Sequence, residues 1–318
     1  MKAIVLDGHA LNPGDLSWRA LEELVDLAVH PRTAADEILT RAAGAAIVLT
    51  NKTPLRENTL RELPELKYIG VLATGYDVVD SAAARALGIA VTNVPTYGTD
   101  SVAQFVFALL LELCHRVQRH SDSAAKEWAG AADWSYHLSP LVELAGKTFG
   151  VVGLGRIGRR AARIADSFGM KVIAADVAQG VPLRYEGFEW VTVDELFERA
   201  DVVSLHCPLT ADNRGLVNAA RLARMKRGAF LVNTSRGPLV VEQDLADALA
   251  AGRLAGAALD VLPVEPPVAG SPLLGAPNCL ITPHLAWATK EARGRLLDQA
   301  VENIAAFLAG RPVNVVNA

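Results

Sequence analysis

A glycine motif between a strand and a helix constrains this sequence more than any other feature. An apolar run at residues 147–152 leads into Gly153-Leu154-Gly155-Arg156-Ile157-Gly158, and a helical pattern follows over residues 159–168. The first glycine permits a tight turn, the second lets a ligand approach the backbone, and the third lets the helix pack closely on its strand. Because the first N–H groups of a helix attract anions, the motif predicts a βα unit that binds a dinucleotide pyrophosphate. The alternative is a glycine-rich turn that only packs the unit.

A carboxylate at the end of the next strand supports the dinucleotide interpretation. Residues 171–175 form a second apolar run that ends in Asp176, 18 residues after Gly158. A carboxylate in this place accepts hydrogen bonds from the ribose 2′-hydroxyl and repels a 2′-phosphate, so we expect NAD rather than NADP. Otherwise Asp176 is an ordinary solvated residue at a strand end.

Length and composition limit the classes of protein that remain. A chain of 318 residues suits two domains, and 51% hydrophobic with 21% charged residues is typical of a globular protein. A net charge of −4 gives no reason to expect a nucleic acid or a membrane as partner. Cys114, Cys207 and Cys279 are too widely spaced for a disulfide framework or a metal site. Because no signal peptide is evident at Met1, we expect a cytoplasmic protein without a bound metal.

Short apolar runs that alternate with helical patterns predict two doubly wound parallel α/β domains. Five runs, at residues 3–6, 24–29, 46–49, 67–72 and 89–91, predict the sheet of a smaller, flavodoxin-like substrate domain. Six runs, at residues 147–152, 171–175, 202–206, 229–233, 256–260 and 279–282, predict a Rossmann sheet. A helical pattern at residues 289–309 is expected to return to the first domain. The predicted domains are therefore residues 1–99 with 286–318, for substrate, and an inserted NAD-binding domain at residues 100–285.

Two segments near the start of the predicted NAD-binding domain have unusual patterns. Residues 102–111 are apolar apart from Gln104, which predicts a buried helix too short to span a membrane. We expect it at a seam between domains or subunits. Residues 127–140 carry Trp128, Trp134 and Tyr136 among small and polar residues. They predict either an ordered loop that covers something or a long packed connection.

Three polar residues follow three strands of the predicted Rossmann sheet. Arg236, Glu265 and His284 come after the strands that end at residues 233, 260 and 282. The carboxyl ends of parallel strands share one edge, where a nicotinamide is expected. Arginine offers a donor fork to a carboxylate or carbonyl oxygen, histidine donates a proton at neutral pH, and glutamate favours and orients the imidazolium. Together they predict reduction of a 2-keto acid, whereas each alone would suggest a surface ion pair, a loop charge or a structural histidine.

A small-residue loop follows the fourth strand of the first domain. Ala73, Thr74 and Gly75 stand where an open α/β sheet binds ligands, so their backbone N–H groups could hold a carboxylate. A simple turn that needs Gly75 explains the same sequence.

Five stretches in one order resemble the D-2-hydroxyacid dehydrogenase family over essentially the whole length: residues 143–158, 204–210, 233–239, 260–267 and 282–289. The resemblance implies that Arg236, Glu265 and His284 are catalytic, and that residues 73–75 bind the substrate together with Arg236 and His284. It also implies a homodimer to which the long helix at residues 100–116 contributes. The cofactor contacts that it implies are Gly153, Gly155, Arg156, Ile157, Gly158, Asp176, Cys207, Pro208, Thr234, Ser235 and Asp260.

Residues 99–104 and 283–289 look like the glycerate dehydrogenase, or hydroxypyruvate reductase, branch of that family. The resemblance therefore predicts reduction of hydroxypyruvate to D-glycerate by NADH. Trp287 is a candidate wall for the pocket around carbon 3, or an anchor for the last helix. Two alternatives stay open: a glyoxylate or D-lactate type reductase, and an NADH-sensing corepressor, because corepressors of this fold resemble the dehydrogenases even at the catalytic residues.

Overall fold

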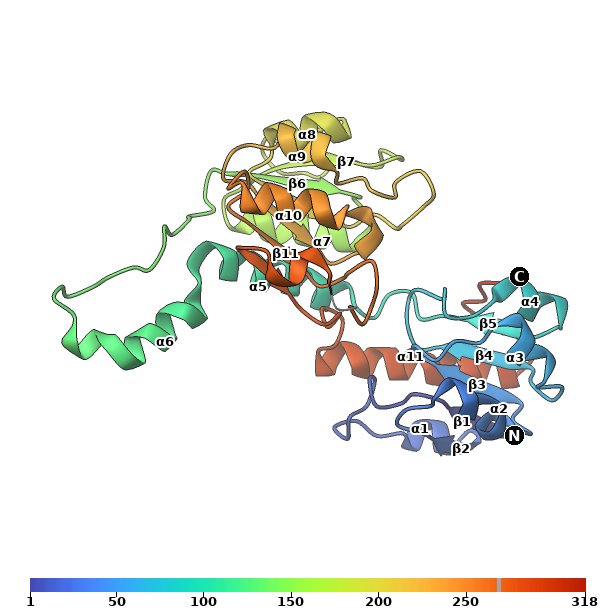
Figure 1. Cartoon of the computed structure of the whole chain (residues 1–318). Coiled ribbons are helices and arrows are strands. Elements are labelled where there is room, and N and C mark those ends of the chain that lie inside the picture. Colours follow the sequence, from blue (N-terminus) through green and yellow to red (C-terminus); the bar gives the residue numbers. More distant parts are fainter. Residues whose placement is uncertain (268–269) are drawn as a thin grey trace. The chain divides into compact units, whose positions relative to one another are not determined.

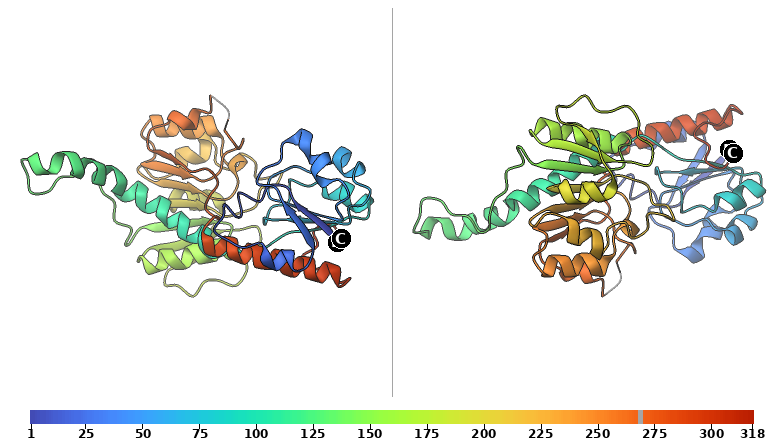
Figure 2. Two further views of the ribbon diagram at one scale, coloured as in Figure 1. Left: turned by 90° about the horizontal axis from the view of Figure 1, so that it is seen from below. Right: turned by 90° about the horizontal axis from the view of Figure 1, so that it is seen from above.

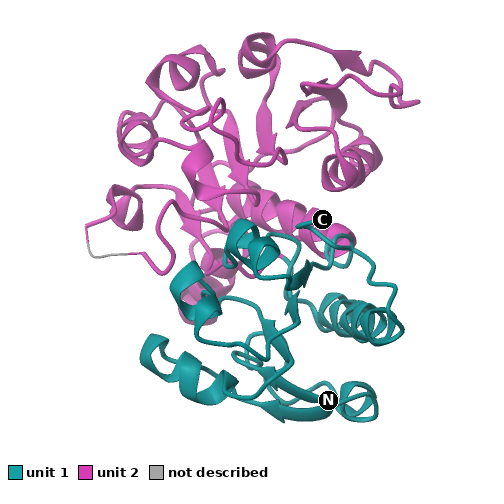
Figure 3. Cartoon of the chain, turned by 90° about the vertical axis from the view of Figure 1, so that its right-hand side faces the viewer, with its two compact units in different colours: residues 1–98, 287–318 teal, residues 99–286 magenta. Residues whose placement is uncertain are grey.

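The structure is a computed structural model that describes residues 1–267 and 270–318. The chain divides into two compact units, shown in teal and magenta in Figure 3. Unit 1 comprises residues 1–98 and 287–318, and unit 2 comprises residues 99–286. None of the helices in the described part of the chain is long and apolar enough to cross a bilayer.

Unit 1 is built on a five-stranded parallel sheet with the strand order β2-β1-β3-β4-β5 (Figure 1). Its strands are β1 (Lys2–Val5), β2 (Asp26–Val29), β3 (Ile47–Thr50), β4 (Tyr68–Val71) and β5 (Ala90–Thr92). Its helices are α1 (Arg19–Glu22), α2 (Ile38–Ala42), α3 (Glu57–Arg61), α4 (Ser81–Ala86) and α11 (Lys290–Leu308). This is the flavodoxin-like order that the alternating pattern predicted.

Both faces of this sheet are buried, which explains why its strands are continuous apolar runs. Successive side chains of a strand point to opposite faces, so Ile4 and Val5 enter different cores. Val5 packs with residues of α1 and α11, whereas Ile4 packs with residues of α2, α3 and α4. Helix α11 therefore belongs to unit 1, although about two hundred residues separate it from β5.

Unit 2 holds a seven-stranded parallel sheet with the order β12-β11-β10-β9-β6-β7-β8. Its strands are β6 (Thr148–Val152), β7 (Lys171–Ala175), β8 (Glu189–Trp190), β9 (Val202–Leu205), β10 (Phe230–Asn233), β11 (Gly256–Leu259) and β12 (Cys279–Ile281). Six of these were predicted, and the prediction of a six-stranded sheet is wrong by one strand. The strand it missed, β8, has two residues, which is too short to show a period.

Helices cover both faces of the second sheet as well. They are α5 (Thr99–His115), α7 (Arg156–Ser167), α8 (Val193–Arg199), α9 (Ala219–Arg224) and α10 (Glu242–Ala250). Val151 of β6 packs with residues of α5 and α7, and its neighbour Val152 packs with residues of α8, α9 and α10. Phe107 of α5 stacks on Phe149 of β6 with the ring centroids 5.5 Å apart. The apolar helix predicted at residues 102–111 is thus part of the core of unit 2.

A further helix, α6 (Val117–Glu127), projects from the body of unit 2 in all the views of Figures 1 and 2. This helix was not predicted, because its polar composition hides the helical period. The segment after it folds back on α6: Trp128 Nε1 donates to the carbonyl of Trp134 at 3.0 Å, and Tyr136 Oη lies 2.9 Å from Ser123 Oγ. We call residues 117–143 the arm.

Candidate active site

The turn after β6 has the geometry that its glycines require. Gly153 has a φ of 93°, and a Cβ there would lie 2.5 Å from the backbone nitrogen of Cys207. A Cβ on Gly158 would lie 2.2 Å from the carbonyl oxygen of Gly153, so only glycine lets α7 start this close to its strand. Gly155 is exposed and a Cβ there would meet nothing within 4 Å. The space over Gly155 at the start of α7 is therefore open to a ligand, next to Arg156 and Ile157.

The loops after neighbouring strands meet at this turn. Asp176 follows β7, and its Oδ2 accepts a hydrogen bond of 2.6 Å from the backbone N–H of Leu154. Ser235, which follows Thr234 after β10, donates its hydroxyl to the carbonyl oxygen of Cys207 at 2.5 Å. Residues predicted to bind the cofactor are thus held around one turn, and hydrogen bonds fix the Asp176 carboxylate and the Cys207 backbone there.

The loop after β9 contributes neutral side chains. Burial raises the pKa of the Cys207 thiol to about 11. Although part of His206 is exposed, its ring is desolvated, which lowers the pKa of this histidine to about 4. Its Nε2 lies 2.9 Å from Ser204 Oγ. Asn213 donates to the carbonyl of Pro208 at 2.8 Å and so closes the turn that carries Cys207 and Pro208.

His284 and Glu265 form a direct pair. Nδ1 of His284 lies 2.6 Å from Oε2 of Glu265, and Oε1 of Glu265 accepts a bond of 2.9 Å from the backbone N–H of Leu262. The two side chains are 28% and 33% exposed, so both are accessible to a ligand. Because a carboxylate only accepts, Nδ1 of His284 must carry the hydrogen in this pair.

Asp260 holds the His284 loop in place. Its buried carboxylate accepts hydrogen bonds from Thr282 Oγ1 at 2.6 Å and from the backbone N–H groups of Leu285 and Ala286 at 2.9 Å each. Burial raises the pKa of Asp260, and this effect exceeds the opposite effect of these hydrogen bonds, which lower it. His284 has a φ of 52°, a left-handed conformation that is uncommon outside glycine. The sequence did not reveal this anchoring role. There the family resemblance implied only that Asp260 contacts the cofactor, which stays a prediction.

Arg236 stands on a loop that packs against the Glu265 loop. Its carbonyl oxygen accepts a bond of 3.0 Å from Asn233 Nδ2, and its Nη1 donates to the carbonyl of Ser235 at 2.9 Å. A Cβ on the next residue, Gly237, would lie 1.9 Å from the carbonyl carbon of Leu262. The glycine therefore lets the loop after β10 touch the segment that leads to Glu265. Within unit 2 the three predicted catalytic residues come from loops that are in contact or share a hydrogen bond.

In unit 1, the loop after β4 has three successive carbonyl groups tied down. The donors are Asn51 Nδ2 to Leu72 O (2.6 Å), the Val94 N–H to Ala73 O (3.0 Å) and Asn93 Nδ2 to Thr74 O (2.7 Å). Among residues 1–267 and 270–318, no hydrogen bond uses the backbone N–H groups of Ala73, Thr74 or Gly75. The carbonyl groups of this loop are thus used within the protein, whereas its N–H groups are not. Such an arrangement of N–H groups is suited to bind an anion. Asn51 and Asn93 escaped the sequence analysis, since nothing local marks them.

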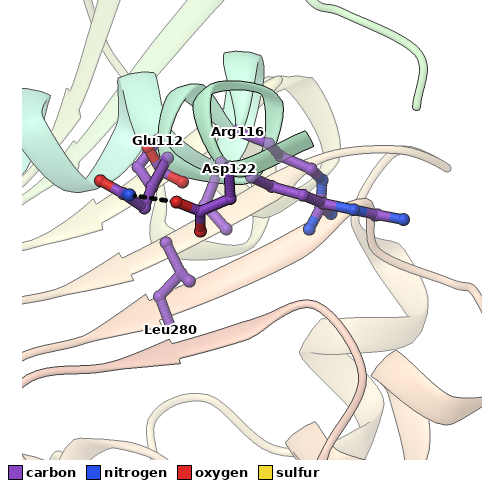
Figure 4. Close-up of a pocket in the computed structure, with 7 residues that line it drawn as sticks. Glu112, Arg116, Asp122 and Leu280 are labelled. Carbon is purple, nitrogen blue, oxygen red and sulfur yellow. Dashed lines mark hydrogen bonds between the residues drawn. The ribbon is translucent and has the colours of Figure 1, made fainter. Parts of the chain in front are cut away.

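Two other features lie apart from these groups. A cavity of about 360 Å³ near the junction of α5 and α6 is lined by Glu112, Arg116, Asp122 and Leu280 among others (Figure 4), and it includes none of the predicted site residues. Trp287 lies in unit 1, where it makes an edge contact with Tyr97 at 6.1 Å and packs on the core. This packing favours the interpretation of Trp287 as an anchor for α11.

Comparisons with known proteins agree with this arrangement. Residues 107–286 match the family model described as D-isomer specific 2-hydroxyacid dehydrogenase, NAD binding domain. A hydroxypyruvate reductase of Blautia hydrogenotrophica is 50% identical, over 100% of both chains. A glycerate dehydrogenase of Methylorubrum extorquens is 42% identical, over 89% of each chain. The crystal structure of the TT0316 protein from Thermus thermophilus superimposes with a TM-score of 0.87 at 38% identity, over 99% of this chain and 100% of that one. The chain belongs to the D-isomer specific 2-hydroxyacid dehydrogenase family.

Proposed function

We propose that this protein reduces hydroxypyruvate to D-glycerate with NADH and that His284 is the general acid. The hydrogen bond of 2.6 Å between His284 Nδ1 and Glu265 Oε2 carries this proposal. The pair stands at the carboxyl ends of strands of the NAD-binding unit, and a histidine is the side chain that most often donates a proton at neutral pH. A carboxylate partner on Nδ1 fixes the orientation of the ring.

The residues around the turn after β6 fit NAD. Gly153, Gly155 and Gly158 with the start of α7 suit the pyrophosphate, because the backbone there is open over Gly155. Asp176 suits a ribose with a free 2′-hydroxyl. When bound, NADH supplies the hydride for the carbonyl carbon. The neutral side chains of His206 and Cys207 add no charge beside it.

The remaining roles belong to the substrate. We assign its carboxylate to the N–H groups of residues 73–75 and to Arg236, whose guanidinium also polarises the carbonyl oxygen. His284 donates its proton to that oxygen as the alkoxide develops, and it is reprotonated from solvent. Similarity to a hydroxypyruvate reductase at 50% identity supports hydroxypyruvate as the substrate.

A panel of 2-keto acids with NADH tests the proposal. We expect kcat/KM for hydroxypyruvate to exceed the values for pyruvate, glyoxylate and bulkier keto acids, and the His284→Ala variant to lose the activity. If pyruvate or glyoxylate wins by tenfold or more, the substrate assignment fails while the reductase assignment stands. No turnover of any 2-keto acid would instead support an NADH-sensing protein.

We also propose that the protein is a homodimer in which a second copy covers the arm. Trp134 is 89% exposed and Trp128 is 53% exposed, and large apolar side chains gathered on a projecting segment mark an interaction surface. The hydrogen bonds from Trp128 and Tyr136 order the segment, so little entropy is lost when it docks.

Sedimentation tests the dimer. We expect a particle of two 33.8 kDa chains, and its dissociation in Trp134→Glu. Val181, which is 77% exposed and lies outside the arm, provides the matched control Val181→Glu, which should stay dimeric. A monomeric native protein would refute the proposal.

We place the protein in the cytoplasm, because its three cysteines are all free thiols, as is usual in a reducing compartment. Cell fractionation checks this assignment.

A further inference from the structure

The loop at residues 72–74 is held by two asparagine side chains, and no local sequence motif predicts this role. Asn51 comes directly after β3 and Asn93 directly after β5, so they flank the loop after β4 from both neighbouring strands. Each donates its Nδ2 to one carbonyl of the loop, and both residues are at most 9% exposed. The loop is therefore clamped from two sides by charge-neutral donors.

The clamp fixes the direction of the peptide groups. An N–H group points away from the carbonyl of the preceding residue in the same peptide plane. When Asn51 holds the carbonyl of Leu72, the N–H of Ala73 is turned the opposite way, and Asn93 does the same for the N–H of Gly75 by holding Thr74. The Val94 N–H on the carbonyl of Ala73 completes the set.

Asn51 carries a cost that its structural contacts do not offset. Three buried side-chain atoms in the described residues lack a hydrogen-bond partner, and Asn51 Oδ1 is one of them. Its amide cannot be reversed to satisfy this oxygen, because the oxygen would then face the carbonyl of Leu72. A buried polar atom without a partner destabilises a fold, and such atoms occur where function requires them. The fold keeps the bond from Asn51 Nδ2 to the carbonyl of Leu72 although Oδ1 stays without a partner.

Asn93 is itself fixed by the last part of the chain. Its carbonyl oxygen accepts a bond of 2.9 Å from Asn303 Nδ2 of α11, and its N–H donates to the carbonyl of Asn314 at 3.2 Å. Asn314 Nδ2 in turn donates to Asn303 Oδ1 at 2.8 Å. A network of three asparagines thus connects the C-terminal segment with the loop.

We propose that Asn51 and Asn93 are positioning residues that aim the N–H groups of residues 73–75 at the substrate carboxylate, and that Asn303 and Asn314 support Asn93 in this task. The inference rests on the proposed function, since it assumes a 2-keto acid substrate. It concerns the carboxylate that all such substrates share, so it predicts the same effect for each of them.

The test is a split between KM and kcat in Asn51→Ala and Asn93→Ala. Without its asparagine, a loop N–H group is no longer aimed at the substrate carboxylate. Loss of a hydrogen bond to such a charged group weakens binding by roughly 10-fold to 100-fold. We expect KM to rise by that factor, equally for hydroxypyruvate, pyruvate and glyoxylate. We expect kcat to change much less, and the dissociation constant of NADH, measured by fluorescence, to stay unchanged. The inhibition constant of oxamate, which carries the same carboxylate, should rise in parallel.

Asn314 and Asn317 provide a matched pair. Asn317 also ties the C-terminal segment to unit 1, through the N–H of Val91 and the carbonyl of Ile89, but it makes no bond to the asparagine network in the described part of the chain. We expect Asn314→Ala to raise KM by roughly 2-fold to 10-fold, the range for an indirect coupling, and Asn317→Ala to leave it unchanged.

Two results would overturn the inference. In the first, the variants fold and bind oxamate as tightly as the native protein. In the second, KM and the NADH dissociation constant rise together, which indicates general damage. If Asn51→Ala does not fold, Asn93→Ala and the Asn314 and Asn317 pair decide the question. Failure of the proposed function looks different, because the native protein itself would then reduce no 2-keto acid.

Discussion

Nδ1 of His284 and Oε2 of Glu265 lie 2.6 Å apart, and the second oxygen of Glu265 is held by the backbone N–H of Leu262. The imidazole is thus oriented by a carboxylate that is itself fixed. Removal of the imidazole in His284→Ala should lower kcat by roughly 10²-fold to 10⁴-fold, the usual contribution of a general acid. NADH binding, measured by fluorescence quenching, should be retained. A variant with near-native kcat would exclude His284 as the acid.

Glu265→Gln should lower kcat. Nδ1 of His284 lies 2.6 Å from Oε2 of Glu265, and this carboxylate orients the imidazole. A glutamine can turn its NH2 group instead of its oxygen toward Nδ1, so it holds the ring less firmly. We expect kcat to fall by roughly 10-fold to 100-fold, less than in His284→Ala. Steady-state rates measure this, and a native kcat in the folded variant would remove Glu265 from the mechanism.

Asp176 should determine the choice between NADH and NADPH. Its carboxylate lies beside the N–H of Leu154 and would face a 2′-phosphate with like charge. The native protein should therefore prefer NADH, and Asp176→Asn, which keeps an acceptor for Leu154, should narrow the preference. The ratio of kcat/KM for the two cofactors is the measurement, and equal efficiency in the native protein would contradict the assignment.

Substitution of two glycines of the turn should affect different properties: stability at Gly158 and NADH binding at Gly155. A Cβ on Gly158 would lie 2.2 Å from a carbonyl oxygen, so Gly158→Ala should lower the free energy of unfolding by about 1–3 kcal/mol or more. A Cβ on Gly155 meets nothing, so Gly155→Ala should change stability by only about 1 kcal/mol yet weaken NADH binding. Urea unfolding and NADH titration of both variants test this. Tight NADH binding by Gly155→Ala would mean that no ligand approaches there.

His206 should make the protein less stable in acid. Burial lowers its pKa from 6.5 to about 4 in the folded protein. Between these values the unfolded chain takes up a proton that the folded chain does not, so stability is lost as the pH falls from about 6.5 to 4. The loss from this group is at most about 3 kcal/mol. Urea unfolding at both ends of this range should show a smaller difference for His206→Gln, and an equal difference would refute the argument.

Much of the fold follows from the sequence because it depends on local patterns. Buried parallel strands need continuous apolar runs, and Gly153 and Gly158 are required by a turn of six residues. The carboxyl ends of such strands share an edge, which is why the sequence alone predicts that Arg236, Glu265 and His284 lie close together. The strand β8 and helix α6 were missed because two residues show no period and a polar helix shows little.

Only the tertiary structure decided how the loops are held. Asp260 was recognised by its place after a strand, but its bonds to Leu285 and Ala286 depend on how β11 and β12 pair. The bond between Asn303 and Asn93 joins residues 210 positions apart, and neither has a local signature. The sequence does not distinguish an asparagine whose side chain is solvated from one whose side chain donates to a buried carbonyl group. Which of the two applies is settled by the partner that the fold brings to it, because a hydrogen bond is formed between atoms in space and not between positions in a chain.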